Sequence, residues 1–545
     1  MSRRRLLSGL AGAAALIAAV TVVSRLLGFV RSLVFASAVG VTGIGGAYNA
    51  ANTIPNVLFE VAAGGALAGA LIPVIAAPLA RGMREDVSRI SSAMLTWTLS
   101  GLVLIGGLLA VFARPVALLT ASNSDPDLVV AFLRVFAVQI PLYGLAVVLS
   151  GVLQAQKKFF WPAFVPVLSS LVVIGTYAGY GWLLRRENLP VTLAPGELPA
   201  GAQDLLAWGT TAGVLAMGLP LIFPVLRSGI RLRPTFRFPP GVGVRARNLA
   251  FAGLGGLAAQ QLSVLVVLKL IDVYGTTPTL VAWQTLIQPV YLLPYAVLAV
   301  PLATSTFPRL AERAARPGRE GFGRLTALTT RGVLTASTVG VVALVAAAPA
   351  VTTVFGRVGN GDAELLGALS DPLALTAPGL LGFGLIFHVS RALYALERGR
   401  LAVIGASVGW AVVIVASWIG CAVLVGGTPD GPATLRALAT GNSVGMLTAG
   451  VVLLVLLRRA AGAEAVQGIA RSAVVLVLAG AAGSWLGRLV VDGLQGALPG
   501  GVTGAVLAAV AGAVAGTVVL LAAVWVTDRG AITGLLRRGR TTTEG

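Results

Sequence analysis

Two arginines stand deep inside the first apolar run of the chain, Arg25 and Arg31 in the segment SRLLGFVR. A charge at the centre of a bilayer costs at least ~2.5 to 3.5 kcal/mol, so we expect an anionic group to meet them. Arginine suits phosphate, because its planar guanidinium donates paired hydrogen bonds and stays charged. Six residues apart, they point about 120° from one another on an ideal helix, so convergence requires a wide cavity or a bend at Gly28. Pairing with Glu60 or backbone carbonyls, or snorkelling of Arg31, is the alternative.

The second apolar run carries a polar stripe. Spacings of three, four and seven residues place on one helical face Asn49, Asn52, Thr53, Asn56 and Glu60. We expect this face to line a water-filled cavity, with interhelical packing by asparagine as the alternative. Glu60 would neutralise an arginine or carry a coupling cation or proton. The predicted substrate-binding residues are therefore Arg25, Arg31, Asn49, Asn52, Asn56 and Glu60.

The sequence contains no catalytic pattern. His388 is the only histidine, no GxxxxGK[ST] phosphate-binding loop occurs, and no paired carboxylates recur at useful spacing. The single cysteine, Cys421, excludes an internal disulfide and a cysteine-based metal site. We therefore expect neither an enzyme nor a metal or cofactor site. We interpret His388 as a packed polar residue, and Lys269 with Asp272 as a local ion pair.

Composition places the chain in a membrane. Of its 545 residues, 57% are hydrophobic and only 11% are charged, which would expose too much apolar surface in water. A crossing needs roughly 20 apolar residues, and this length predicts an all-α polytopic membrane protein of about fourteen helices. They lie near 8–38, 47–79, 90–113, 128–153, 161–184, 204–226, 246–272, 278–303, 326–348, 373–396, 401–426, 437–457, 470–491 and 502–526.

The basic residues test this helix count. Of the 40 lysines and arginines, 28 fall in alternate loops, as the positive-inside rule requires. Both termini are therefore expected in the cytoplasm, with the chain in the plasma (inner) membrane. The net charge of +20 is scattered through these loops, so we expect no nucleic-acid partner. The N-terminus imitates a signal peptide, but its apolar run continues into SRLLGFVR and is interpreted as a retained helix.

An internal echo suggests two related halves. Ser150-Gly-Val-Leu-Gln-Ala and Ser390-Arg-Ala-Leu-Tyr-Ala lie 240 residues apart, each at the end of a predicted helix. Transporters commonly consist of such repeats, with the substrate site between them. The predicted organisation is an N-terminal six-helix lobe (1–230), a C-terminal six-helix lobe (231–460), and two extra helices with a short basic tail (461–545).

Four segments resemble the MurJ (MviN) lipid II flippase family. They are SRLLGFVR (24–31), AYNAANTIPNVLFEVAAGGALAGALIPVI (47–75), QAQKKFFWPAFVPVLSSLVVIGTY (154–177) and LLPYAVLAVPLATSTFPRL (292–310). The resemblance implies a MOP-superfamily exporter with two six-helix lobes around a central cationic cavity, plus two helices. The implied substrate is lipid II, an undecaprenyl-diphosphate-linked disaccharide pentapeptide, moved to the outer leaflet by alternating access. Arg25 and Arg31 match the family's first-helix arginines.

The chain also departs from well-known members of that family. It lacks an acidic residue at Gly46 and basic residues at Phe59 and near Pro289, and is more similar to actinobacterial members. The alternatives are a flippase for another polyprenyl-diphosphate glycan, a MOP antiporter, and a non-transporting cell-wall scaffold. Besides lipid II, the expected partners are membrane lipids, a coupling cation or the membrane potential, and cell-wall synthesis or division proteins.

Overall fold

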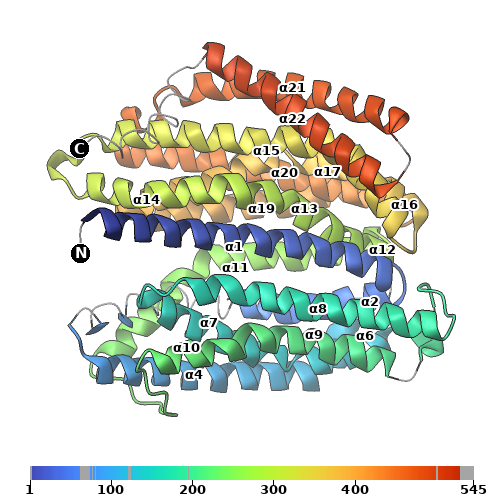
Figure 1. Ribbon diagram of the computed structural model, residues 1–545, viewed down its shortest axis with the longest axis horizontal. Helices are drawn as coiled ribbons and strands as arrows, with labels where there is room; N and C mark the ends of the chain where they lie inside the picture. Colours follow the sequence, from blue (N-terminus) through green and yellow to red (C-terminus); the bar gives the residue numbers. More distant parts are fainter. Residues whose placement is uncertain are drawn as a thin grey trace. The chain divides into compact units, whose positions relative to one another are not determined.

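All regular structure in the described part of the chain is helical (Figure 1). The computed structural model describes residues 3–61, 71, 74–75, 78–79, 81–120, 124–193, 195–199, 201–498 and 501–527. Thirteen helical stretches within them are long and apolar enough to cross a membrane. They match thirteen of the predicted crossings. The remaining one, 47–79, runs beyond the described residues, and α2 (Ile44–Phe59) covers its first part. The all-α polytopic fold class is confirmed.

The chain divides into two compact units, Met1–Asp272 and Val273–Gly545. The three-part division at residues 230 and 460 stays a prediction. Besides α2, the helices of the first unit are α1 (Arg3–Ala38), α4 (Arg84–Val111), α5 (Ala113–Thr120), α6 (Pro126–Phe136), α7 (Gln139–Ala155), α8 (Phe160–Arg186), α9 (Ala202–Gly218), α10 (Ile222–Arg227) and α11 (Val242–Tyr274).

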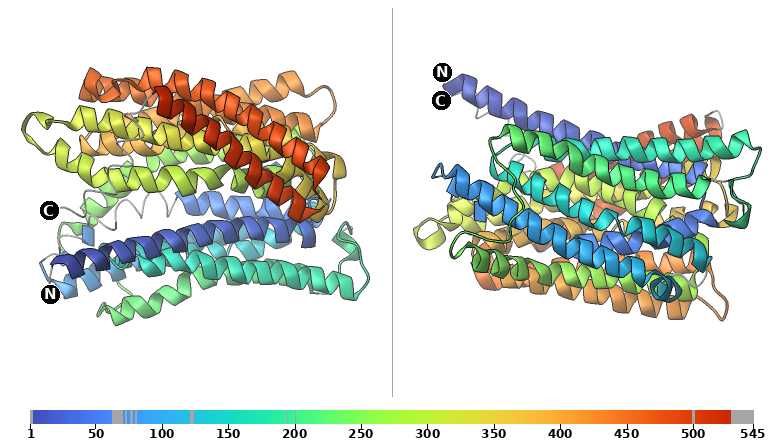
Figure 2. Two further views of the ribbon diagram at one scale, coloured as in Figure 1. Left: turned by 45° about the horizontal axis from the view of Figure 1, so that its top comes forward. Right: turned by 90° about the horizontal axis from the view of Figure 1, so that it is seen from below.

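Within the first unit, α8 packs against both α1 and α9, and α4 packs against α7 (Figure 2). Buried side chains such as Ile90 on α4, Leu149 on α7 and Val225 on α10 form a core in this unit. The start of α6 is fixed locally, because the Asp125 carboxylate accepts hydrogen bonds from the backbone N–H groups of Asp127 and Leu128. Such a cap satisfies donors that the first helical turn leaves unpaired.

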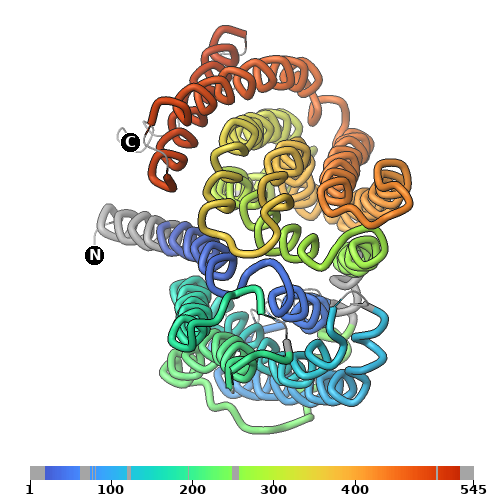
Figure 3. The backbone as a smooth tube through the Cα atoms, turned by 90° about the vertical axis from the view of Figure 1, so that its right-hand side faces the viewer, coloured from blue at the N-terminus to red at the C-terminus, as the bar shows by residue number. Residues whose placement is uncertain are grey.

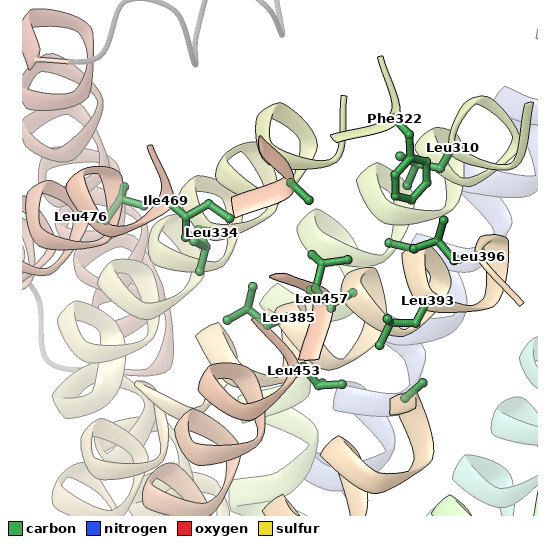
Figure 4. Packing of buried hydrophobic residues seen from close by; sticks show 14 of the residues in the cluster. Leu310, Phe322, Leu334, Leu385, Leu393, Leu396, Leu453, Leu457, Ile469 and Leu476 are labelled. Atoms are coloured by element: carbon green, nitrogen blue, oxygen red, sulfur yellow. The ribbon is translucent and has the colours of Figure 1, made fainter. Parts of the chain in front are cut away.

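The second unit contains the remaining helices. They are α12 (Thr277–Val281), α13 (Gln288–Pro294), α14 (Val300–Ala314), α15 (Phe322–Val358), α16 (Ala363–Gly367), α17 (Ser370–Thr376), α18 (Gly379–Ala395), α19 (Gly399–Leu424), α20 (Gly431–Ala461), α21 (Ile469–Ala497) and α22 (Val502–Thr527). Two π-helical stretches, Ala282–Ile287 and Tyr295–Ala299, interrupt the crossing that contains α13. Figure 4 shows the core of this unit, where Leu385, Leu393 and Leu453 pack together.

Each unit contains a membrane crossing that is divided into two helices, α6 and α7 in the first unit and α17 and α18 in the second. Four positions of this broken crossing recur 240 residues apart. They are the last residue of its first helix, the first and last residues of its second helix, and a following residue with positive φ. These pairs are Phe136 and Thr376, Gln139 and Gly379, Ala155 and Ala395, and Lys157 and Glu397. The offset is that of the sequence echo, so the predicted internal repeat is confirmed for these helices.

The helices α21 and α22 pack against each other and against α15 (Figure 3). Glycines stand where the backbones of α21 and α22 approach closely. A Cβ atom added to Gly512 would lie 2.5 Å from the Gly487 carbonyl oxygen, and one on Gly483 would lie 2.5 Å from that of Gly516. Backbones in membranes approach this closely only where side chains are absent. The two glycine pairs therefore fix the crossing of α21 and α22.

We predict that Gly512→Ala lowers the melting temperature of the purified protein, because the new methyl group forces two backbones apart. Overpacking of this kind typically costs about 1 to 3 kcal/mol. The matched control is Gly493→Ala on α21, where an added Cβ meets nothing within 4 Å. It should keep or raise stability, since alanine is the better helix former. Equal melting temperatures for both variants would contradict the proposed crossing.

Candidate functional site

The two predicted arginines lie on α1 with exposed side chains. Within the described residues, neither Arg25 nor Arg31 forms a hydrogen bond or ion pair. The charges of the two guanidinium groups are therefore uncompensated by an ion pair within this part of the chain.

The polar stripe of α2 divides into an inner and an outer part. Asn49 is only 6% exposed, and its amide nitrogen donates to the Gly45 carbonyl oxygen at 2.9 Å. Thr53 is also buried, and its hydroxyl donates to the Asn49 carbonyl oxygen at 2.7 Å. These side chains satisfy polar groups of their own helix, which is how asparagine and threonine act in helix packing. Nothing in this geometry shows Asn49 available to a ligand.

The outer part of the stripe contains Asn52 and Asn56, which are half-buried, and Glu60, which is exposed. The Asn52 side-chain oxygen is buried without a hydrogen-bond partner among the described residues. The Asn56 oxygen accepts a hydrogen bond from the Tyr143 hydroxyl at 3.1 Å. Glu60 is exposed and follows α2 directly, at the start of a short π-helical turn. Pairing of Glu60 with Arg25 or Arg31 is not observed within the described residues.

Tyr143 connects these groups, although the sequence reasoning missed it. Its ring stacks on Phe59 with 4.3 Å between the ring centroids, and its hydroxyl bonds Asn56. Tyr143 on α7 thus fixes the outer part of the polar stripe of α2. The only signal in the sequence was a tyrosine within an apolar run, which is equally typical of packing.

A second group of hydroxyls joins three helices of the first unit. The Tyr48 hydroxyl lies 2.9 Å from both the Tyr177 hydroxyl on α8 and the Thr210 hydroxyl on α9. The Tyr48 ring packs edge-on against Phe132 and Phe136. This arrangement holds the start of α2 against α6, α8 and α9, and so fixes the helix that carries the polar stripe.

The equivalent region of the second unit is aromatic. Phe383 stands 240 residues after Tyr143 and packs against Tyr291, Tyr295 and Trp410 at centroid distances of 5.7 to 5.9 Å. Arg391 lies over the Phe387 ring, with 3.5 Å from its guanidinium carbon to the centroid. The repeat therefore preserves the scaffold, while the chemistry of its polar and aromatic positions differs.

The structure confirms two smaller interpretations of isolated polar residues. His388 is fully buried, and its Nε2 atom lies 3.1 Å from the Thr329 hydroxyl, which makes it a packed polar residue. Lys269 Nζ donates to the Asp272 carboxylate at 2.7 Å, one turn along α11.

Comparison with known proteins gives consistent matches. A family model described as lipid II flippase MurJ matches residues 35–498. A probable lipid II flippase MurJ of Synechocystis sp. is 31% identical over 242 residues, which cover 43% of each chain. Lipid II flippase MurJ of Burkholderia cenocepacia is 26% identical over 392 residues, covering 69% of this chain and 72% of the relative.

Two solved structures share the fold. Lipid II flippase MurJ in an inward closed conformation superposes with a TM-score of 0.72 at 18% identity, covering 95% of this chain and 99% of that chain. An inward-facing multidrug resistance MATE transporter of the MOP superfamily gives a TM-score of 0.59 at 12% identity, covering 80% and 95%.

We predict that Tyr177→Phe lowers the melting temperature, because it removes the hydroxyl that bonds Tyr48. Loss of such a buried hydrogen bond costs about 1 kcal/mol. Tyr180→Phe, one turn along the same helix, is the control, since the Tyr180 hydroxyl is buried without a partner in the described structure. Removing that hydroxyl should leave stability unchanged or raise it. The reverse order of the two melting temperatures would refute the hydrogen-bond assignment.

Proposed function

Because the chain belongs to the MurJ lipid II flippase family, we propose that it translocates lipid II from the inner to the outer leaflet of the plasma membrane. The headgroup carries a diphosphate, which needs cationic and hydrogen-bonding groups within the bilayer. The observation that carries this proposal is the pair Arg25 and Arg31, exposed and without an ionic partner in the described part of the chain.

In the proposed mechanism, the guanidinium groups bind the diphosphate by paired, charge-assisted hydrogen bonds. Asn52 and Asn56 offer neutral polar atoms from α2 to the polar headgroup. Asn49, buried in helix packing, supports α2 in this role. Glu60 lowers the net positive potential, so that the bound anion is released. Alternating access would move the repeated helix bundles around this site.

This function requires neither a catalytic residue nor a cofactor, and we propose a transporter without enzymatic activity. Transport would draw on a coupling cation or the membrane potential, and cell-wall synthesis or division proteins would receive the product. A drug-cation antiporter is less consistent with two intramembrane arginines. A flippase for another polyprenyl-diphosphate glycan shares the same anionic group, and a scaffold without transport would not use the arginines.

We predict that Arg25→Ala and Arg31→Ala each reduce lipid II flipping by roughly 10- to 100-fold, since one charge-assisted hydrogen bond contributes about 1.5 to 3 kcal/mol. Lysine should restore part of the activity, because it keeps the charge but loses the planar fork. Complementation of a conditional flippase depletion provides the measurement. Arg400→Ala, an exposed arginine at the start of α19, is the control. Normal growth of both alanine variants would exclude the substrate-binding role.

We predict that Glu60→Gln strengthens lipid II binding and slows turnover, while the melting temperature stays unchanged. Breaking a buried ion pair would cost about 3 to 5 kcal/mol, but Glu60 is exposed and has no ion pair within the described residues. Lipid binding, flipping rate and thermal unfolding of the purified variant distinguish a role of Glu60 in substrate release from a role in supporting the fold. A large loss of stability would assign Glu60 to fold support, and no change in any measurement would remove both roles.

The distribution of arginines supports cytoplasmic termini. We predict that Pro240→Cys, in the longest basic loop, reacts with an impermeant thiol reagent only after the cells are opened. Glu197→Cys, in a loop predicted on the opposite side, should react in intact cells. Both positions are exposed, whereas the native Cys421 is buried. Labelling of position 240 from outside would reverse the proposed orientation.

A further inference from the structure

The segment between α10 and α11 is an extended strap, residues 228–241, that lies along the first turns of α4. Its backbone N–H groups bond a row of hydroxyls on that helix: Arg231 N to Ser88 at 3.2 Å, Arg233 N to Ser92 at 3.0 Å, and Thr235 N to Thr96 at 3.1 Å. The spacing of the hydroxyls along α4 matches the spacing of the N–H groups along the strap, because four helical residues rise about 6 Å and two extended residues about 6.6 Å. The strap therefore has a fixed register on α4.

Both ends of the strap are also anchored. Gln156 donates to the Ser228 hydroxyl at 3.0 Å, and Phe238 packs against the core of the first unit. Leu232 points to the same core. Since side chains alternate along an extended chain, Arg231 and Arg233 face away from it, and both are exposed together with Arg237. The result is a ridge of three arginines on an ordered backbone.

An aromatic pair lies further along α4. The Trp97 indole N–H donates to the Phe236 carbonyl oxygen at 3.0 Å, and the two rings meet edge-on at 5.2 Å. Their side chains are 55% and 53% exposed, which is unusual for such large apolar groups unless lipid covers them. Ser88 and Trp97 are separated by about 13 Å along the helix. The strap thus places Arg231 and Arg233 nearer the start of α4 than the aromatic rings, and Arg237 directly after Phe236.

This order matches the layers of a membrane interface. With 28 residues, α4 is about 42 Å long, which exceeds the ~30 Å hydrocarbon core and leaves its first turns among the headgroups. Tryptophan and phenylalanine suit the level where headgroups meet acyl chains. Arginines beside them meet the phosphate layer. An acidic protein would satisfy the arginines but would give no reason for the exposed aromatic pair beside them.

We propose that this strap is a binding site for anionic phospholipid headgroups, with Arg231, Arg233 and Arg237 on the phosphate and Trp97 with Phe236 against the acyl chains. The site differs from the Arg25 and Arg31 pair and holds resident membrane lipid. It does not depend on lipid II transport. Arginines that only set the topology need no ordered backbone. Here Ser88 and Ser92 bond the backbone N–H groups of Arg231 and Arg233, and the Arg237 N–H donates to the Thr235 hydroxyl.

The test uses the purified full chain in neutral detergent, titrated with fluorescent phosphatidylglycerol and with phosphatidylcholine. Phosphatidylglycerol should bind more tightly, and Arg231→Gln/Arg233→Gln/Arg237→Gln should weaken it on the order of 100-fold, at roughly five-fold per basic residue. The control removes three exposed arginines of the second unit, Arg309, Arg319 and Arg324, and should change binding less than three-fold. Ser88→Ala/Ser92→Ala/Thr96→Val keeps every charge but frees the strap, and should also weaken binding.

Three outcomes would overturn the proposal. Equal losses in the two arginine triple variants would show diffuse attraction between opposite charges. Equal affinity for the two phospholipids would show that no anion site exists. Tighter binding of polyglutamate than of phosphatidylglycerol, lost in the strap variant, would assign the ridge to an acidic protein partner. Thermal unfolding of each variant, followed by circular dichroism, shows whether a loss of binding is due to misfolding. The comparison of phosphatidylglycerol with phosphatidylcholine uses the wild-type protein and does not depend on any variant.

Discussion

The bilayer core offers no water to a polar group, and this constraint governs the whole structure. Helices satisfy the backbone, so each polar side chain must find its own partner. Hydroxyls do so by donating to the carbonyl oxygen four residues earlier, as in Thr53, Thr210 and Thr338. A guanidinium cannot be satisfied in this way, because it carries five donors and a charge. Arg25 and Arg31 are therefore groups whose partner is expected from outside the helix that carries them.

The same constraint explains how the repeat is joined together. Each broken crossing begins its second segment with a donor that reaches a hydroxyl on a neighbouring helix: Gln139 Nε2 to Thr211 on α9, and the Gly379 N–H to Ser443 on α20. The donor is the Gln139 side chain in the first unit and the Gly379 backbone N–H in the second. The position of Tyr143 in the first unit is equivalent to that of Phe383 in the second. The tyrosine hydroxyl forms a hydrogen bond, whereas phenylalanine makes only aromatic contacts, although the helices begin and end at equivalent positions.

The fold was predictable because crossing length, arginine alternation and the repeat depend on one-dimensional patterns. The site was only partly predictable. Helical spacing put Asn49 and Asn56 on one stripe, but Asn49 bonds its own helix and Asn56 bonds Tyr143. Which neighbour covers each part of a stripe depends on helices far away in sequence. For the same reason, neither Tyr143 nor the match of the strap to Ser88, Ser92 and Thr96 could be read from spacing alone.

A flippase must release what it binds, and the lack of an ion pair at Arg25 and Arg31 in the described structure suits that requirement. A carboxylate bonded directly to the arginine would compete with the diphosphate and cancel its charge. Neither Arg25 nor Arg31 has a carboxylate partner in the described structure, so their charge stays available. Glu60 directly follows α2 and forms no ion pair there. In the proposed mechanism, its carboxylate weakens the attraction for the anion and leaves the paired hydrogen-bond geometry of arginine intact.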